Sequence, residues 1–317
     1  MTGAVFVFGS INADTSYRVA ALPAPGETVI ASSASESPGG KGANQAIAAA
    51  AAGAPTHMIG VGGDDPAAAP LLDALEARRV DTDAVCVHPG ATTGRAVVYV
   101  DDAAENSIVV LAGANGLVDS AVASSGLSSI SAGDVLVLQN EVPAPANRAA
   151  AALARAAGAT VIWNAAPAPA SVADLVTGID LLVVNENELV QISGILGINA
   201  IADDTHAASL SGLLAATARA LDTDAVCTLG SDGSSYFVDG HAGSLPAPRV
   251  RALDTTAAGD TVVGYLAAHS DLPIAQRLRL AGTAGALAVT REGASTSIPH
   301  LGDVERMLAA LTERTPA

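Results

Sequence analysis

The sequence predicts an α/β fold of three layers, in which helices cover both faces of a mostly parallel sheet. From residue 134 onward, short apolar runs alternate regularly with helical segments, which is typical of parallel strands joined by crossover helices. Polar residues directly follow several apolar runs, as expected where the carboxyl ends of parallel strands form a ligand-binding edge. A few strands outside this alternation predict a second, smaller sheet.

Length and composition exclude several classes of protein. The chain has 317 residues, 50% of them apolar, so it can bury a sizeable core. A formal charge of −17 argues against nucleic acid or an anionic membrane as a partner. No apolar run approaches the roughly 18 residues of a membrane span. The two cysteines are too few for a disulfide framework, so we expect buried thiols in a soluble, cytoplasmic protein.

The beginning of the chain predicts two strands separated by polar residues. Ala4 to Phe8 is a short apolar run, typical of a buried strand in the central sheet. Asn12 and Asp14 follow at its carboxyl end, where they could either cap a turn or contact a ligand. Glu27 to Ser33 predicts a second strand, in which small and polar residues alternate.

A glycine-rich stretch, residues 37–45, leads into a helix predicted at Ala46 to Ala52. The glycines around Lys41 fail the phosphate-binding loop pattern, because Gly42 stands where that loop needs Ser or Thr. A tight glycine turn at a helix start would instead offer backbone N–H groups, an ammonium and the Asn44 amide. Such a turn suits a polyhydroxylated ligand as well as an anion, and a flexible surface loop is the alternative.

The next segments are a helix and several strands. In order, we expect strand Thr56–Val61, helix Pro66–Arg79, strand Ala84–Val87, and strands Thr93–Val100 and Ser107–Leu111 joined by a polar turn at 101–105. The strands of the hairpin, together with Glu27 to Ser33, do not fit the strand–helix alternation around them. They predict the small separate sheet.

From Asp134 the strand–helix alternation is regular. We expect strand Val135–Gln139, helix Ala146–Ala157, strand Thr160–Trp163, helix Ser171–Val176, strand Asp180–Val184, helix His206–Leu221, strands Ala225–Leu229 and Ser235–Val238, and long helices from Gly259 and Ile274. Polar clusters follow four of these strands, at 140–141, 164, 185–188 and 228–233. Each cluster alone is typical of a turn, but together they predict one polar rim at the carboxyl edge of the sheet.

The stretch from Asp254 to Thr261 is the centre of the predicted site. Its small residues allow a tight turn, and the apolar run that follows predicts a helix beginning near Gly259. The free backbone N–H groups and the dipole of a helix N-terminus favour an anion, especially phosphate. Asp260 would place a carboxylate beside that anion. It could simply cap the helix, or it could take a proton from a hydroxyl that attacks a phosphoryl group.

The chain resembles the ribokinase-like sugar kinases, the phosphofructokinase-B-type family, from Gly9 to Pro299. Two motifs carry most of the resemblance, namely Gly39-Gly-Lys-Gly-Ala-Asn-Gln45 and Asp254-Thr-Thr-Ala-Ala-Gly-Asp-Thr261. Between them lie Pro25-Gly-Glu-Thr28, Ala112-Gly-Ala-Asn115, Asn185-Glu-Asn-Glu188 and Thr228-Leu-Gly-Ser231, in the expected order. The resemblance implies a ribokinase-like α/β/α fold forming a single domain over residues 1–317. A small, discontinuous β lid would be formed by about 13–36 and 92–112.

The implied activity is ATP-dependent transfer of a phosphoryl group to the primary 5-hydroxyl of D-ribose, giving ribose 5-phosphate. By position, catalysis would depend on Asp260 as the base, on the backbone at Ala257, Ala258 and Gly259 as an anion hole, and on Lys41. The sugar ligands would be Asn12, Asp14, Gly40, Lys41, Asn44, Glu141 and Asp260, with Ala96, Val98 and Ile108 of the lid as apolar cover.

The resemblance also implies cofactors and a partner. The nucleotide would contact Asn185, Thr228, Leu229, Gly230, Ser231, Asp232, Gly233, Gly259 and Gly282. Mg²⁺ bound with ATP would meet Glu188 through water, because Mg²⁺ keeps much of its hydration shell. An activating K⁺ would bind mostly backbone carbonyls, at Asp254, Thr256, Ala288, Arg291, Gly293 and Ser297. Because such lids often associate in the family, we expect a homodimer joined lid to lid.

Some residues leave alternatives open. Arg291 to Gly293 could be a plain helix end with a glycine stop. Gly282 stands where the family often has an Asn or His against the adenine, so nucleotide preference stays open. Ala165 replaces the first Pro of the usual Asn-Pro-Ala-Pro, and Val262 and Val263 replace the common Phe-Asn. A kinase for deoxyribose, fructose or adenosine is the alternative activity, and a non-catalytic sugar- or nucleotide-sensing homologue is the alternative class.

Overall fold

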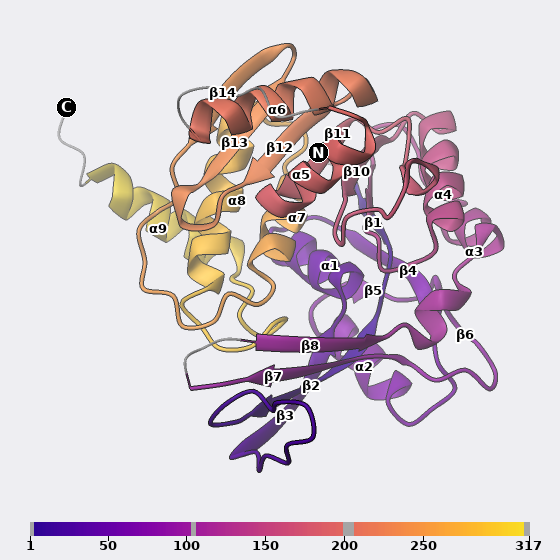
Figure 1. Ribbon diagram of the computed structural model, residues 1–317. Helices are drawn as coiled ribbons and strands as arrows, with labels where there is room; N and C mark the ends of the chain where they lie inside the picture. Colours follow the sequence, from indigo (N-terminus) through magenta and orange to yellow (C-terminus); the bar gives the residue numbers. More distant parts are fainter. Residues whose placement is uncertain (1–2, 103–105, 199–205, 314–317) are drawn as a thin grey trace.

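The computed structural model describes residues 3–102, 106–198 and 206–313, and its main sheet forms the middle of the molecule (Figure 1). Within the described residues, the strands follow one another in the order β14 (His241–Leu245), β13 (Ser234–Val238), β12 (Asp224–Thr228), β11 (Leu181–Asn185), β10 (Thr160–Asn164), β9 (Val135–Leu138), β1 (Val5–Phe8), β4 (Thr56–Gly62) and β5 (Val80–Asp81), and β6 (Val85–Val87) also pairs with β4. Strands β12 to β14 pair antiparallel, and the other pairs are parallel. The predicted, mostly parallel sheet is therefore confirmed.

Helices cover both faces of this sheet, because alternate residues of a buried strand point to opposite faces. On one face, α1 (Lys41–Ala51), α2 (Ala68–Ala77), α7 (Ala258–Ala268), α8 (Ile274–Ala288) and α9 (Leu301–Glu313) pack on a core that includes Val5, Val7 and Val137. On the other face, α3 (Ser120–Gly126), α4 (Ala144–Ala156), α5 (Glu186–Ile195) and α6 (His206–Leu221) pack on Phe6, Phe8 and Leu138. The three-layer arrangement is thus confirmed.

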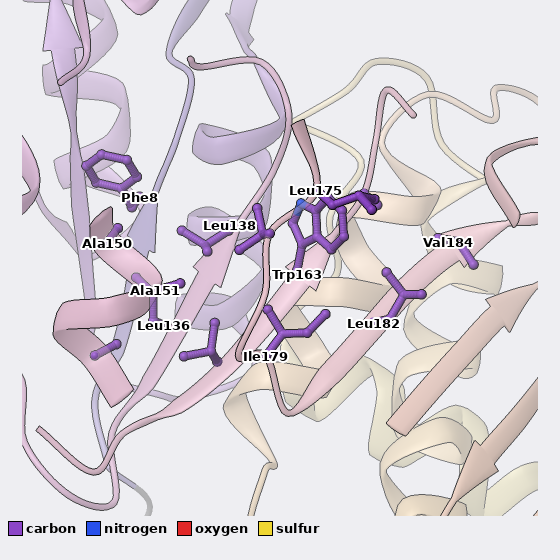
Figure 2. Packing of buried hydrophobic residues seen from close by; sticks show 14 of the residues in the cluster. Phe8, Leu136, Leu138, Ala150, Ala151, Trp163, Leu175, Ile179, Leu182 and Val184 are labelled. Atoms are coloured by element: carbon purple, nitrogen blue, oxygen red, sulfur yellow. The ribbon is translucent and has the colours of Figure 1, made fainter. Parts of the chain in front are cut away.

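Figure 2 shows part of the second core, where Trp163 lies between Leu138 and Leu175. The indole ring is fully buried, and its N–H donates to Oδ1 of Asn140 at 2.9 Å. The apolar ring therefore fills the core while its polar N–H stays hydrogen-bonded.

A second sheet projects from the main body at the bottom of Figure 1. Its strands lie in the order β3 (Ser33–Gly39), β2 (Asn12–Arg18), β7 (Gly94–Val100) and β8 (Asn106–Leu111). The β7–β8 hairpin is confirmed, and part of its predicted turn, 103–105, lies outside the described residues. Short 3₁₀ helices complete the fold, namely η1 (Gly113–Leu117), η2 (Val172–Asp174) and η3 (Gly230–Asp232).

Several sequence predictions of local structure were wrong. Residues 27–32 form no strand, and the strand predicted at Glu27 to Ser33 is replaced by β3, which begins at Ser33. A helix was predicted at Ser171 to Val176, but only a short 3₁₀ turn forms there. Helix α1 begins at Lys41 rather than Ala46, so the glycine-rich stretch is the end of β3 and the first turn of α1. Helices α3, α5 and α9 were not predicted.

Two further findings concern the cysteines and the membrane. Cys227 is buried as expected, whereas Cys86 is exposed, and both are free thiols. Burial raises the pKa of Cys227 to about 12, so this thiol is a poor nucleophile. Among the described helices, none combines the length and the apolar character that a bilayer crossing requires.

Candidate active site

The carboxyl ends of β10, β11 and β12 and the start of α7 surround a cavity of about 240 Å³, which we call the edge cavity. It is lined by Lys41, Asn164, Ala166, Val183, Val184, Asn185, Glu188, Thr228, Thr255, Ala257, Gly259, Asp260 and Val263. Parallel strands place ligands at this edge of a sheet. The polar clusters that follow successive strands in the sequence thus contribute to one site.

Helix α7 begins beside this cavity. Ala257 caps the helix with a φ of 57°, in the left-handed region, and α7 runs from Ala258. Because a residue with a Cβ is strained there by roughly 1–2 kcal/mol, the surrounding structure must hold this turn in place. A side chain built on Gly259 would meet open space within 4 Å, so this backbone is accessible from the cavity. The N–H of Ala258 already donates to the Thr255 carbonyl at 3.3 Å, so the first turn of α7 offers an anion mainly the N–H of the residues that follow, beginning with Gly259.

Asp260 lies in that first turn and is only 7% exposed. Its Oδ2 accepts a hydrogen bond from Nδ2 of Asn44 at 3.1 Å, and its Oδ1 accepts one from Nε2 of Gln45 at 2.9 Å. The Asp260 carboxylate, followed by Glu141, holds the pKa of Lys41 above its ordinary value despite burial. The site thus joins a fixed carboxylate to a charged ammonium at a helix N-terminus.

The predicted sugar ligands lie together near the end of β1. Glu141 accepts hydrogen bonds at Oε2 from the Ser10 hydroxyl, at 2.6 Å, and from the backbone N–H of Lys41, at 2.9 Å. Gly40 has a φ of 85°, and a Cβ there would lie 3.0 Å from the backbone nitrogen of Asn12. Glycine is required at this position because L side chains rarely adopt that conformation and the backbones approach closely.

Asp14 connects the second sheet to this group. Asp14 pairs with Ala96 on β7, and Ser16 pairs with Val98. Ala96 and Val98, two of the lid residues named from the resemblance, therefore lie on the same face of the second sheet as Asp14. Ile108 pairs with Val98, and its side chain lies outside the described residues. Burial raises the pKa of Asp14 to about 7, and the carboxylates of Glu141 and Asp260 contribute to the rise.

The predicted nucleotide residues divide into two groups. Asn185, Thr228 and Gly259 line the edge cavity, whereas residues 229–233 and Gly282 do not. Gly233 has a φ of 102°, and a side chain there would overlap the backbone at the end of β14, first of all the Leu245 carbonyl. This glycine is therefore required by the β12–β13 turn itself, independently of any ligand.

The residues near the predicted Mg²⁺ position form a helix cap. Oδ1 of Asn185 accepts from the backbone N–H of Glu188, and Oε2 of Glu188 accepts from the backbone N–H of Asn185, both at 2.8 Å. Burial raises the pKa of Glu188, against the effects of the Asn185 N–H and Lys41. Within the described residues there is no cluster of three or more His, Cys, Asp or Glu side chains that could hold a metal. Glu188 lines the edge cavity, so its carboxylate could contact the water around an Mg²⁺ ion that is carried by phosphates.

Two residues of the predicted K⁺ site, Thr256 and Gly293, are joined by Asp254. Its Oδ1 accepts from the backbone N–H and the hydroxyl of Thr256, and its Oδ2 accepts from the backbone N–H of Gly293 at 2.9 Å. Burial acts to raise the pKa of Asp254, but these hydrogen bonds outweigh it, so the pKa lies below its ordinary value. Helix α8 ends at Ala288, so the turn from Arg291 to Gly293 lies beyond the helix. The Ala288 carbonyl accepts a hydrogen bond from the backbone N–H of Arg291.

Three polar residues of the site were given no role from the sequence. Ser10 holds Glu141, and Gln45 holds Asp260. Asn115 accepts from the backbone N–H of Ile11 and donates to Oδ1 of Asn12 at 2.7 Å. Gln45 and Asn115 lie in motifs of the family resemblance, and Ser10 stands two residues before Asn12, so closeness to predicted ligands was the available signal.

Comparison with known proteins identifies the family. The family model described as pfkB family carbohydrate kinase matches residues 3–301. The chain is 34% identical over 311 residues to a ribokinase of Schizosaccharomyces pombe, covering 95% of this chain and 96% of the relative. It is 33% identical to a ribokinase of Staphylococcus aureus, covering 97% and 100%. The solved ribokinase of Arabidopsis thaliana, complexed with ribose and ATP, aligns with a TM-score of 0.83 at 29% identity, covering 97% and 99%. The chain belongs to the pfkB family of carbohydrate kinases.

Proposed function

We propose that the chain transfers the γ-phosphoryl group of ATP to the 5-hydroxyl of D-ribose. The observation that carries this proposal is the buried carboxylate of Asp260, fixed by two side-chain amides at the N-terminal turn of α7. In-line phosphoryl transfer depends on positioning and on charge stabilisation more than on covalent chemistry. Ribose is favoured over other sugars because the relatives named above are ribokinases over nearly their whole length.

Each group has a distinct task in this transfer. Asp260 accepts the proton of the attacking hydroxyl, within reach of the amide groups that orient it. The backbone N–H groups at Ala257 to Gly259 receive the charge that develops on the phosphoryl oxygens, assisted by the Lys41 ammonium. The carboxylates of Asp14 and Glu141 and the amides of Asn12 and Asn44 bind the sugar hydroxyls, with Gly40 allowing close approach and the lid residues covering the sugar.

The nucleotide and its cations complete the proposal. ATP occupies the cavity side formed by Asn185, Thr228 and Gly259, and residues 229–233 and Gly282 bind its nucleoside part. Mg²⁺, when bound with ATP, neutralises phosphate charge next to Glu188. K⁺ binds at the loops joined by Asp254, whose carboxylate and neighbouring carbonyls are oxygen ligands suited to that ion. A homodimer through the second sheet and a cytoplasmic location remain predictions.

A coupled assay of ADP release tests the activity over a panel of ribose, deoxyribose, fructose, adenosine and other nucleosides. We expect the highest kcat/KM with ribose. A higher value with another sugar or nucleoside would reassign the substrate within the family. Binding of sugar without ADP release from any acceptor would support a sensing protein instead and overturn the proposed transfer.

A further inference from the structure

A chain of buried amides, which begins at Asn164 in the wall of the edge cavity, reaches the Asp260 carboxylate. Nδ2 of Asn164 donates to the backbone carbonyl of Val183 at 3.1 Å. Oδ1 of Asn164 accepts from Nε2 of Gln45 at 2.9 Å, and the same Nε2 donates to Oδ1 of Asp260 at 2.9 Å. The chain therefore runs from β11 through β10 and α1 to α7.

The orientation of every amide in this chain is determined by its neighbours. The Val183 carbonyl can only accept, so the amino group of Asn164 must face it and the Asn164 oxygen must face Gln45. Both the Asn164 oxygen and the Asp260 carboxylate can only accept at these contacts. Gln45 must therefore point its amino group, with both N–H bonds, toward these two acceptors.

Gln45 makes these contacts at a cost to its own carbonyl. The side chain is 0% exposed, and its Oε1 is buried without a hydrogen-bond partner among the described residues. Leaving a buried acceptor unpaired is unfavourable, and an apolar side chain would avoid that cost if the position served packing alone. The presence of an amide is explained by the two N–H bonds that it supplies.

Gln45 does not line the edge cavity, so its effect on the cavity must pass through its two partners, Asp260 and Asn164, which both line it. Asn44 holds the other carboxylate oxygen, Oδ2, but Asn44 is one of the proposed sugar ligands and its own Oδ1 is unpartnered. Of the two amides, Gln45 is the one that also donates to a second protein group, Asn164, and that has no proposed contact with sugar. It therefore keeps the carboxylate plane fixed whether or not sugar is bound.

On the basis of the phosphoryl transfer proposed above, we propose that Gln45 is a positioning residue that fixes the Asp260 carboxylate for proton acceptance. Loss of its N–H bonds lets the carboxylate rotate away from the attacking hydroxyl. Because small misplacements of a reacting group are costly, kcat should fall about 10- to 100-fold. Ribose affinity should change less than about threefold, because Gln45 does not reach the sugar.

The test compares Gln45→Met, which keeps the length of the side chain, with Gln139→Met. Gln139 is also 0% exposed, and its side chain makes no hydrogen bond to Asp260, so the same chemical change there should leave kcat within about threefold of the unchanged protein. Gln45→Glu provides a second variant of the same shape, since an ionised carboxylate cannot donate to Asp260 and repels it. We expect it to lose at least as much kcat as Gln45→Met. Thermal melts and ribose titrations accompany each variant.

A double-mutant cycle separates positioning from folding. In an Asp260→Asn background, Gln45→Met should cost no further kcat, because the group it positions is already gone. Wild-type kcat in a folded Gln45 variant, or an equal loss in both backgrounds, would overturn the role. The ratios are measured on whichever sugar gives the highest rate. A failure of the protein on ribose would therefore count against the proposed substrate and leave this comparison intact.

Discussion

At the scale of single residues, the Asp260 carboxylate is the group whose removal should separate binding from chemistry. Asp260→Asn keeps the shape of the side chain but cannot accept a proton from the hydroxyl. We expect kcat to fall by roughly two to four orders of magnitude, the range for loss of a general base. The dissociation constant for ribose, measured by calorimetry, should stay within a few-fold. Asp119→Asn, at the exposed cap of α3, is the control and should keep wild-type kcat. A near wild-type kcat in Asp260→Asn would show that Asp260 is not the general base.

The raised pKa of Asp14 predicts how kcat/KM for ribose depends on pH. Its pKa of about 7 means that the carboxyl is largely protonated below neutrality, where one of its oxygens becomes an O–H donor and its capacity to accept from sugar hydroxyls falls. We expect kcat/KM for ribose to fall as the pH drops through about 7. A profile of kcat/KM against pH measures this. A flat profile from about pH 8 to about pH 5.5 would show that Asp14 does not bind the sugar as an anion.

The same raised pKa predicts a stability effect. The unfolded chain loses this proton near 3.8 and the folded protein near 7, so the folded state binds the extra proton between these values. Stability attributable to Asp14 is therefore lost as the pH rises through that window, and the full penalty is present above about 7. Asp14→Asn should raise the melting temperature more at about pH 8 than at about pH 5. An equal change at both pH values would contradict the burial of a charged Asp14.

At the scale of the elements, the sequence predicted those strands and helices whose pattern follows from burial. Strands β1, β9 and β11 are buried in the main sheet and are continuous apolar runs, which made them easy to identify. Strands β2 and β3 carry mainly polar and small residues, and β2 is half-buried while β3 is largely exposed. Their sequences therefore contain no periodic signal, and one strand was predicted six residues too early.

Helix α5 shows a different limit of the sequence. Its capping box, formed by Asn185 and Glu188, was interpreted only as part of a ligand-binding rim. The same two residues cap the helix and line the edge cavity, so the structural and functional signals coincide. Likewise, the left-handed turn at Ala257 has no glycine to mark it, and only the packed loops around it reveal it.

The prediction of K⁺ activation concerns the loops that Asp254 joins. An ion bound to the carbonyls of these loops would order the turn at Ala257 and so preset the N–H groups of α7. We expect activity at constant ionic strength to rise in K⁺, with Na⁺ unable to substitute fully. In Asp254→Asn, the ratio of activity in K⁺ to that in tetramethylammonium should fall toward one. Equal activity of the dialysed, unaltered protein in all three salts would show that no such ion acts here.

At the scale of the whole molecule, the site is assembled from segments far apart in the chain. Gln45 and Asp260 are 215 positions apart, and Ser10 and Glu141 are 131 apart. The sequence could predict that polar residues gather at one edge, because all the strands before them are parallel. It could not predict which amide faces which carboxylate, since that depends on the register of the sheet and the packing of α1 on α7.

The exposed edge of the second sheet leads to the prediction of a homodimer. Strand β8 lies at the end of this sheet and exposes Val109 by 62%, Val110 by 54% and Leu111 by 55%. An unpaired edge with exposed apolar side chains is a site of association, and pairing with a second copy would bury both. We expect light scattering to show a dimer at assay concentration and Val109→Lys combined with Leu111→Lys to give a monomer.

Val172→Lys is the matched control for that variant, since Val172 is also 62% exposed but lies outside the second sheet. It should leave the dimer intact. Because two joined lids limit each other's opening, the monomeric variant should show a raised KM for ribose with a smaller change in kcat. An unaltered protein that is monomeric and fully active would contradict the homodimer. A control that dissociates as readily as the double variant would show that the loss of the dimer does not depend on the β8 edge.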